Sequence, residues 1–283
     1  MSELHPPARG GQVAIVTGAN AGIGRVTAIE LAKRGFHVFL ACRSSEKTRP
    51  VLDTIASEAP RAKAEFLELD LGDLASVRGA AEQFLRRDLP LPLLVNNAGL
   101  GGHRGLSASG FELTFGVNHI GHFLFTNLLL DRIRQSDRAR IVTVASRAHY
   151  RSRGIDFEAV RKTTRSATGM PEYDTSKLAN VLFSAELGRR LAGSNVTTYS
   201  LHPGVVASDI WRRIPAPARW LIKLFMISSE EGAKTTLYCA TSSEVGNETS
   251  LYYDTCRPKR PSALAQDERL AAELWRRSED WTA

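Results

Sequence analysis

Short apolar runs alternate with longer segments of helical period along most of the chain. Strands that alternate with helices of about ten or more residues indicate βαβ units, and their right-handed crossovers place helices on both faces of a parallel sheet. We therefore predict an α/β fold, a doubly wound sheet of seven parallel strands in a single domain. The seven runs of strand length are VAIVT at 13–17, HVFLA at 37–41, AEFLELD at 64–70, LPLLVN at 91–96, RIVTVAS at 140–146, VTTYSL at 196–201 and SLYYD at 250–254.

Two stretches do not fit this alternation. Residues 147–171 form a long polar insertion, and residues 203–231 mix prolines with a strongly apolar segment. Long irregular stretches in a compact domain are usually lids or binding loops. We expect residues 1–10 to form a flexible leader, residues 11–260 the main domain with a substrate lid at 203–231, and residues 261–283 a helical tail.

The composition is typical of a soluble globular protein, since 43% of the 283 residues are hydrophobic and 24% are charged. No apolar stretch approaches the roughly 20 residues of a membrane-spanning helix, and the first residues lack the apolar core of a secretory signal. Cys42, Cys239 and Cys256 form no CxxC motif and no cluster with histidine. Neither a disulfide framework nor a metal site is predicted, and we expect a cytoplasmic protein.

The net charge of +7 is spread along the chain in pairs such as Arg86–Arg87, Arg189–Arg190 and Arg212–Arg213. A nucleic-acid-binding protein would gather such an excess into one basic stripe with interleaved aromatic residues. Scattered charge is typical of solvated helix faces and loops. We therefore expect no nucleic-acid partner.

The stretch TGANAGIG at 17–24 joins the first apolar run to the first helical segment. Gly18 permits a sharp turn, Gly22 lets the backbone approach a pyrophosphate without a Cβ, and Gly24 lets helix and strand pack closely. A tight turn alone would also explain the glycines. Their place in the first βα unit, where the backbone N–H groups at the helix start attract an anion, favours a dinucleotide-binding site. The further candidates for contact within this turn are Asn20 and Ile23.

The end of the second strand decides which dinucleotide fits, because it lies beside the adenosine ribose in such folds. An acidic side chain there bonds a free 2′-hydroxyl, whereas an arginine accommodates a 2′-phosphate. This strand ends without an acidic residue, and Arg43 follows it. We expect NADP(H) rather than NAD(H); the alternative is that Arg43 is a solvated loop charge. Lys47 either assists Arg43 in binding the 2′-phosphate or lies in the first turn of the next helix.

Tyr173 and Lys177 are four residues apart in a segment that has helical period after Pro171. Residues at i and i+4 share a helix face. An ammonium beside a phenol stabilises the phenolate and lowers a pKa that starts near about 10. Such a tyrosine can exchange a proton with a substrate oxygen near neutral pH. The spacing alone is weak evidence, because it also arises by chance.

Five motifs in order resemble the short-chain dehydrogenase/reductase family: TGANAGIG, NNAG at 96–99, a serine that ends the fifth strand, YDTSK, and HPG at 202–204. The resemblance covers roughly residues 10 to 255. It is greatest to the retinol dehydrogenase-like branch, through VFLACR, NHIGHF, RIVTVAS followed by AH, and HPGVV. It implies a Rossmann fold that binds NADP within residues 11–260 and interconverts an alcohol and its aldehyde or ketone.

The resemblance implies a catalytic role for four residues. Tyr173 would be the general acid/base, and Lys177 would hold the nicotinamide ribose and lower the pKa of the tyrosine. Ser146 would bond the substrate oxygen, and Asn118 would stabilise a water that links Lys177 to solvent. The alternatives are an ordinary hydroxyl at a strand end for Ser146 and a helix-bending polar residue for Asn118.

Other residues would contact the cofactor by the same resemblance. Asp70 would contact the adenine, or would instead cap the helix that follows. The chain departs from the branch where Ala145 precedes Ser146 and where Ser208 replaces a common threonine, and we expect little effect because the hydroxyls remain. The remaining cofactor candidates are Leu71, Asn97, Ala98, Gly99, Pro203, Gly204, Val206 and Ser208.

The segment 210–226 is unusually apolar for a surface and carries interspersed basic residues. It is interpreted as a lid over a lipophilic substrate, as a peripheral membrane contact, or as a packing or dimer helix. Relatives often pair through the helix that carries Tyr173, so a homodimer or homotetramer is expected. The sequence shows no N-terminal apolar anchor of the kind that membrane-bound relatives carry, which weakens the transfer of a retinoid substrate.

We therefore expect an enzyme that reduces a lipophilic carbonyl compound with NADPH. The alternative is a nucleotide-sensing regulator on the same fold. Such a protein would keep the glycine turn and lose the tyrosine or the lysine, whereas this chain has both, together with Ser146 and Asn118.

Overall fold

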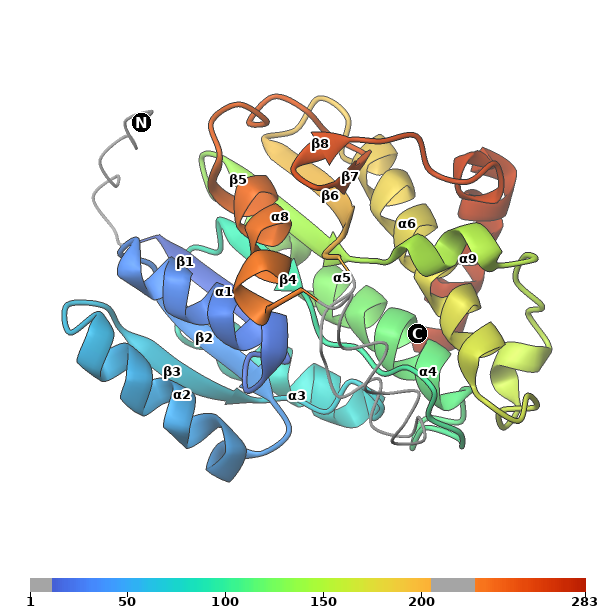
Figure 1. The fold of residues 1–283 in the computed structure, drawn as a ribbon, viewed down its shortest axis with the longest axis horizontal. Helices are drawn as coiled ribbons and strands as arrows, with labels where there is room; N and C mark the ends of the chain where they lie inside the picture. The colour runs from blue at the N-terminus through green and yellow to red at the C-terminus, as the bar shows by residue number, and fades with distance from the viewer. Residues whose placement is uncertain (1–11, 205–226) are drawn as a thin grey trace.

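The computed structural model describes residues 12–204 and 227–283. They form one sheet with helices on both faces (Figure 1). The strand order is β3-β2-β1-β4-β5-β6-β7-β8, and each pair is parallel except β7 with β8. The strands are β1 (Val13–Thr17), β2 (His37–Cys42), β3 (Ala64–Glu68), β4 (Leu93–Asn96), β5 (Ala139–Val144), β6 (Val196–His202), β7 (Leu251–Asp254) and β8 (Arg257–Pro258).

Several helices begin where the sequence supplies a capping side chain or, for the helix at 170–190, a proline in the first turn. Ser44, Asp73, Ser228 and Asp267 accept backbone N–H groups at the starts of four helices. The helices are α1 (Gly22–Lys33), α2 (Ser45–Glu58), α3 (Leu74–Leu85), α4 (Leu113–Phe115), α5 (Gly121–Arg134), α6 (Met170–Arg190), α8 (Ser229–Thr241) and α9 (Glu268–Thr282). The short turns are the π-helical η1 (Gly116–Ile120) and the 3-10 turns η2 (Arg147–Arg151), η3 (Ala159–Arg161) and η5 (Leu264–Gln266).

Alternate residues of the central strand point to opposite faces of the sheet, so β1 is buried on both sides. Ala14 and Val16 belong to a core with α1, α2 and α8, whereas Val13 and Ile15 belong to a core with α3, α5 and α6. This double burial explains why the strands appear in the sequence as nearly continuous apolar runs. The predicted doubly wound sheet of seven parallel strands is confirmed.

An eighth strand that the sequence analysis did not predict extends the sheet. Thr255 and Cys256 both have positive φ, +55° and +58°, and turn the chain back between β7 and β8. Two-residue hairpins of this kind usually contain asparagine or glycine. Neither residue is present here, so the turn could not be predicted from local sequence. Pro258 is tolerated because β8 is the edge strand.

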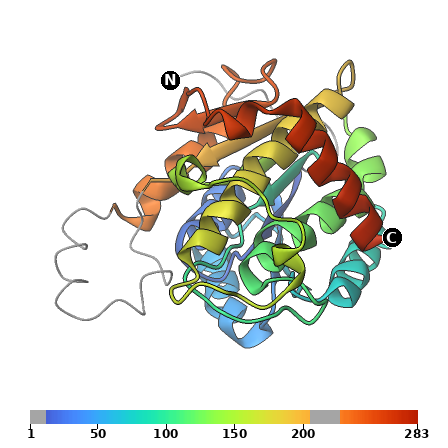
Figure 2. The same ribbon diagram turned by 90° about the vertical axis from the view of Figure 1, so that its right-hand side faces the viewer.

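The C-terminal helix α9 lies along α6 (Figure 2). Its buried Trp275 stacks on Phe183 of α6, with ring centroids 5.9 Å apart, and meets Phe123 of α5 edge-on at 5.0 Å. The Arg190 guanidinium lies 4.4 Å above the same indole ring. Helix α6 is therefore covered on one side by the sheet and on the other by α9.

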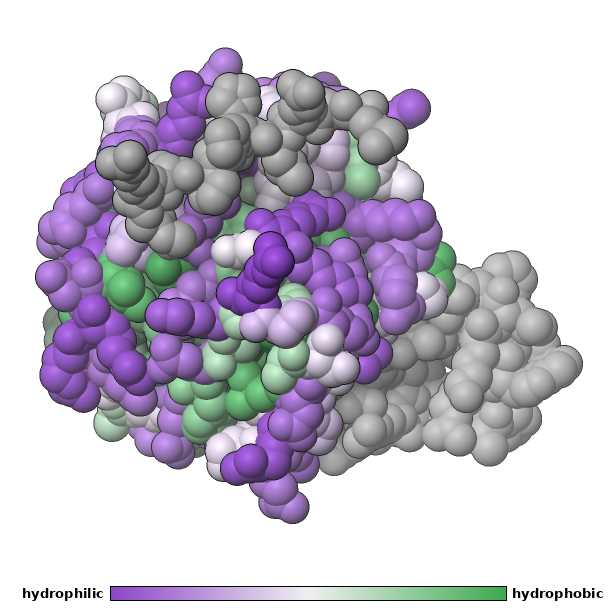
Figure 3. Space-filling model, turned by 90° about the vertical axis from the view of Figure 1, so that its left-hand side faces the viewer, coloured by the Kyte–Doolittle hydropathy of each residue, from purple (hydrophilic) through white to green (hydrophobic). Residues whose placement is uncertain are grey.

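The face seen from the left-hand side of Figure 1 is mainly hydrophilic, and its apolar side chains gather in limited areas (Figure 3). Within residues 12–204 and 227–283, none of the helices has both the length and the apolar character needed to cross a bilayer.

We predict that Trp275→Ala lowers the free energy of unfolding by about 3–5 kcal/mol, because it removes a large buried side chain from a well-packed site. Urea denaturation measures the loss. Arg276→Ala, at an exposed position on the same helix, is the control and should change the stability by about 0.5 kcal/mol or less. A loss for Trp275→Ala as small as that of the control would contradict the described packing of α9 on α6.

Candidate active site

A cleft of about 1260 Å³ opens at the carboxyl ends of the parallel strands. The strand order reverses its direction between β1 and β4, and doubly wound sheets bind ligands at such a switch point. Each predicted cofactor segment before residue 204 contributes to the wall. The lining residues that the sequence predicted are Gly18, Asn20, Gly22, Ile23, Gly24, Arg43, Asp70, Leu71, Asn97, Ala98, Gly99, Tyr173, Lys177 and Pro203.

The three glycines of the first turn are required for different reasons. Gly18 has φ +65°, and a Cβ there would lie 2.9 Å from Ala98 Cα. Gly22 has φ +52° and faces open space on the cleft wall, which leaves its backbone accessible to a phosphate. A Cβ on Gly24 would lie 2.4 Å from Gly18 O and from the Asn97 amide, so this glycine permits close approach of the helix start to both loops.

Thr17, directly before this turn, connects the loops after β1 and β4. Its hydroxyl oxygen accepts the N–H groups of Asn97 and Ala98, each at 2.9 Å, and lies 2.9 Å from His122 Nε2. The Asn97 side chain donates to Thr17 O at 2.8 Å. The side chain of Asn97 is therefore occupied within the protein, and the cleft receives the backbone of residues 97–99.

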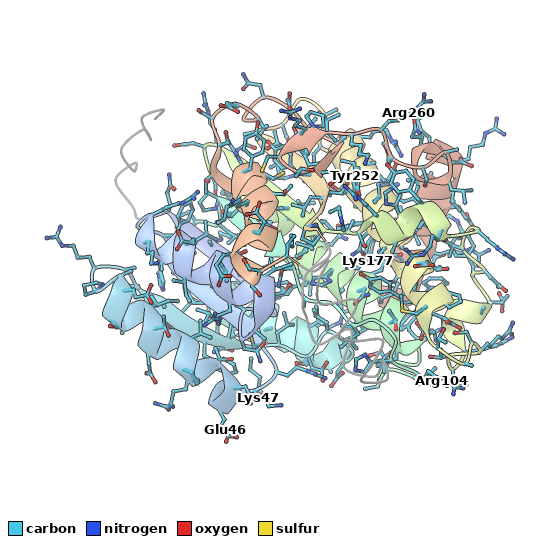
Figure 4. All side chains as sticks on the ribbon, viewed as in Figure 1. Glu46, Lys47, Arg104, Lys177, Tyr252 and Arg260 are labelled. Carbon is cyan, nitrogen blue, oxygen red and sulfur yellow. The ribbon has the colours of Figure 1, made fainter. Side chains whose placement is uncertain are left out.

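The adenosine end of the predicted seat carries basic side chains. Arg43 and Lys47 are exposed on the cleft wall, and Lys47 lies at the start of α2 (Figure 4).

Asp70 Oδ1 accepts the N–H of Gly72 at 2.9 Å. Asp73, rather than Asp70, caps α3, so the alternative interpretation of Asp70 as the helix cap is wrong.

Tyr173 and Lys177 both line the cleft from α6. Gly169 and Pro171 start this helix as the sequence suggested, and Lys177 Nζ lies 5.7 Å from the centre of the Tyr173 ring. The buried amine donates to Val144 O of β5 at 2.8 Å, and Figure 4 shows Lys177 near the centre of the molecule. A Cβ on Gly99 would approach this amine to 3.4 Å.

The expected lowering of the Tyr173 pKa by Lys177 is wrong for this structure. Burial is the largest effect and raises the pKa of Tyr173, while a hydrogen bond with Ser146 acts in the opposite direction. Burial also lowers the pKa of Lys177 to about 8. Burial is thus the first cause of both shifts, and the phenol keeps its proton at neutral pH.

Ser146 and Asn118 stand behind the cleft wall and contact the residues that form it. Ser146 lies two residues beyond β5, caps η2 by accepting the N–H of Ala148 at 3.1 Å, and acts on the pKa of Tyr173 as a nearby hydroxyl that lowers it. The Asn118 amide donates to Leu100 O and to Ser176 Oγ, both at 2.9 Å. Asn118 lies in the π-helical turn η1, so its location also fits the interpretation of a polar residue at a helix irregularity.

Two predicted cofactor residues, Val206 and Ser208, and the segment 210–226 lie outside the described residues. Gly204 is described with φ +94°, but it is not part of the cleft wall. Other lining residues were not predicted, because most of them have small or apolar side chains that carry no chemical signal of their own. These are Ala21, Ala41, Cys42, Ser44, Leu69, Leu100, Gly101, His103, Val117, Val144, Ala145 and Ser229.

Among residues 12–204 and 227–283, histidine, cysteine and acidic side chains form no group of three or more that could hold a metal ion.

Known proteins resemble this chain over most of its length. The sequence model of a family described as short chain dehydrogenase matches residues 12–218. Retinol dehydrogenase 11 from Homo sapiens is 42% identical over 268 residues, which are 94% of this chain and 84% of that protein. A crystal structure of a protein from Mycobacterium Paratuberculosis is 35% identical, covers 98% of this chain and 95% of its own, and has a TM-score of 0.79.

A crystal structure of a short chain dehydrogenase from Shigella flexneri, complexed with NADP, shares the fold. Its TM-score is 0.69 at 21% identity, and the match covers 87% of this chain and 97% of the other.

Three buried histidines should make the stability depend on pH. Burial lowers the pKa of His119 to about 3 and those of His122 and His202 to about 4. The unfolded chain takes up these protons below about pH 6.5, whereas the folded chain does not. We predict that the free energy of unfolding is largest above pH 6.5 and falls by about 1–3 kcal/mol per histidine toward pH 4.

Urea denaturation at pH 7.5 and pH 5 measures this dependence. His119 packs among the rings of Phe115, Phe123 and Phe183, so a phenylalanine should fit in its place. In His119→Phe the free energy of unfolding should therefore fall less between the two pH values, by the contribution of one histidine. Equal stability of the wild type at the two pH values would show that the histidines are not buried as described.

Proposed function

The chain belongs to the short-chain dehydrogenase family, as its motifs predicted, and we propose that it is an NADP(H)-dependent reductase of lipophilic aldehydes or ketones. Membership, with similarity to retinol dehydrogenases, makes it an oxidoreductase that acts on CH–OH groups. The observation that carries the proposal is that Tyr173 and Lys177 line the same cleft as the glycine turn.

The residues around the cleft fit a pyridine dinucleotide. A cavity of about 1260 Å³ exceeds the roughly 300–1000 Å³ of most small-molecule sites, which leaves room for a substrate beside the nucleotide. The bare backbone at Gly22 and the start of α1 would receive the pyrophosphate. Lys177 Nζ would hold the ribose next to the nicotinamide. The bound nucleotide supplies the hydride in reduction and accepts it in oxidation.

The raised pKa of Tyr173 supports the reductive direction. A phenol that is protonated at neutral pH can donate its proton to the oxygen of a carbonyl as that oxygen gains negative charge. The Ser146 hydroxyl, which lies close enough to Tyr173 to lower the pKa of the phenol, would bind the same substrate oxygen. The Lys177 amine, with a pKa of about 8, is mostly protonated at pH 7 and would be the source of the proton that restores the Tyr173 phenol.

The preference for NADP(H) rests on charge at the adenosine end of the cleft. Arg43 and Lys47 are exposed there, and neither has an ion-pair partner among the described residues. A guanidinium and an ammonium would bind a 2′-phosphate by charge-assisted hydrogen bonds. Asp70 and the loop that carries it would lie against the adenine.

The substrate class rests on the apolar segment 210–226 and on the relatives. Human and mouse relatives carry the name retinol dehydrogenase, which supports a long, apolar aldehyde or alcohol as substrate. The segment would then cover that substrate, and its basic residues would face anionic headgroups if it touches a membrane. Pairing of two copies through α6 would have to displace α9, because α9 already covers the outer side of that helix.

We predict that Tyr173→Phe lowers kcat by about 10²-fold or more, because a positioned acid or base contributes about 10²–10⁴-fold. The dissociation constant for NADPH should stay within about threefold. Stopped-flow turnover and nucleotide fluorescence measure the two quantities. Tyr238→Phe is the matched control and should turn over like the wild type. Tyr238 lies on α8, and its hydroxyl donates to Glu244, which follows that helix. Wild-type turnover by Tyr173→Phe would mean that the proton comes from another group.

We predict that Arg43→Asp lowers the ratio of kcat/KM for NADPH to that for NADH by at least about 10-fold. A lost hydrogen bond to a charged group is worth about 1.5–3 kcal/mol, which corresponds to about 10–100-fold. Initial rates with both nucleotides measure the ratio. Arg49→Asp makes the same charge change on the exposed side of α2 and should leave the ratio nearly unchanged. If both variants lower the ratio equally, the cause is the change in net charge, and Arg43 does not bind the phosphate.

A further inference from the structure

His149 is a fully buried side chain next to the active site that the proposed reaction does not use. It stands in η2, the turn that begins directly after Ser146. Its Nδ1 lies 2.6 Å from Ser146 O, and its Nε2 lies 3.2 Å from the backbone N of Ser262. The ring packs against Tyr150 and Tyr252, with centroids 4.0 Å and 4.8 Å away.

The partners of the ring determine its tautomer. The Ser262 N–H group is only a donor, so Nε2 must carry the lone pair and accept it. Nδ1 then carries the hydrogen and donates it to the Ser146 carbonyl. Burial and the nearby Lys259 lower the pKa of His149, which keeps the ring neutral at pH 7 and preserves both hydrogen bonds.

The segment that contains Ser262, whose N–H binds His149 Nε2, is anchored at further points. The Tyr150 hydroxyl donates to Arg260 O at 2.6 Å. Asp254 accepts from Arg147 at 2.7 Å and from Lys259 at 2.9 Å. Figure 4 shows Tyr252 and Arg260 above Lys177, toward the β8 side of the molecule. The chain from β8 to η5 therefore forms a fixed support on which His149 rests.

We propose that His149 is a positioning residue for Ser146. Its Nδ1–H holds the Ser146 carbonyl, and the turn that this bond closes directs the Ser146 hydroxyl toward Tyr173. Its Nε2 fastens the turn to residues 257–266, so the C-terminal segment supports the geometry of the catalytic serine. The inference rests on the proposed function, in which Ser146 binds the substrate oxygen.

The position of Ser146 Oγ follows from the same turn. Oγ accepts the N–H of Ala148, and this places the oxygen as long as the turn keeps its shape. Without the side-chain bond, the Ser146 carbonyl would keep only the longer, 3.2 Å bond from the backbone N–H of His149, and the turn would be held less firmly. Displacements of about 1 Å at a catalytic group can cost about 10²-fold in rate.

Two variants separate the two hydrogen bonds of the ring. His149→Asn places an amide nitrogen where Nδ1 stood and keeps the donor to Ser146 O, but it loses the acceptor for Ser262. His149→Gln reaches the Nε2 position and accepts from Ser262, but it loses the donor to Ser146. We expect kcat to fall by at most about threefold for His149→Asn, because the turn keeps its own bond and loses only its anchor to residues 257–266, and by at least about 10-fold for His149→Gln. The KM for NADPH should be unchanged in both, because the nucleotide seat is formed by other loops.

A double variant tests whether the effect passes through Ser146. Once Ser146→Ala has removed the hydroxyl, adding His149→Gln should lower kcat no further. The positioning role would be overturned if the double variant lost kcat by the product of the two single losses. Equal losses of kcat in His149→Asn and His149→Gln would overturn it too. Wild-type kcat in His149→Gln would overturn it as well. An inactive wild type would instead contradict the proposed function itself.

A measurement on the unaltered protein covers the case in which the variants do not fold. Long-range ¹H–¹⁵N NMR correlations of the histidine rings distinguish Nδ1–H from Nε2–H. The inference requires the Nδ1–H tautomer for His149 at pH 7. An Nε2–H tautomer or a charged ring would overturn it.

Discussion

The buried amine of Lys177 is the constraint around which the site is arranged. It lies where α6 meets the end of β5 and the loop after β4, and its bond to Val144 O fixes the helix against the sheet. An amine in such surroundings loses hydration, so it keeps its place only if each neighbour leaves room or accepts a hydrogen bond. Gly99 leaves that room, because a Cβ there would crowd both Lys177 and Asn118. Tyr173, one turn earlier on α6, is held at the cleft by the same contact.

The rigidity of α6 also depends on parts of the chain far from the cleft. Trp275 of α9 covers the outer side of the helix, and the Arg151–Asp174 ion pair ties its first turn to the loop after β5. The helix is therefore packed on opposite sides, which limits the motion of Tyr173 and Lys177. In our proposal, residues 257–266 do the same for Ser146 through His149. The C-terminal part of the chain, which the sequence indicated only as a helical tail, thus supports the candidate site.

Local patterns predicted the fold and the composition of the cleft wall well. Double burial made the strands apolar, the i, i+4 rule put Tyr173 and Lys177 on one face, and glycine chemistry identified the turn after β1. The hairpin at Thr255 and Cys256 could not be predicted, because its positive φ values occur without glycine or asparagine. Ser262, which contacts His149, and Phe183, which contacts Trp275, lie about a hundred residues from these side chains in sequence, where periodicity carries no information. The direction of the Tyr173 pKa shift depends on burial, which only the packed structure provides. The catalytic and nucleotide-binding roles of the site residues stay predictions.

The most direct test follows a labelled hydrogen from nucleotide to product. NADPH deuterated at both C4 positions of the nicotinamide is incubated with the protein and a panel of straight-chain aldehydes, retinaldehyde, steroid ketones and quinones, and the products are analysed by mass spectrometry. The account predicts an alcohol with one deuterium on the former carbonyl carbon. NADPH left unconsumed with every compound, or oxidised without deuterium in any product, would contradict it.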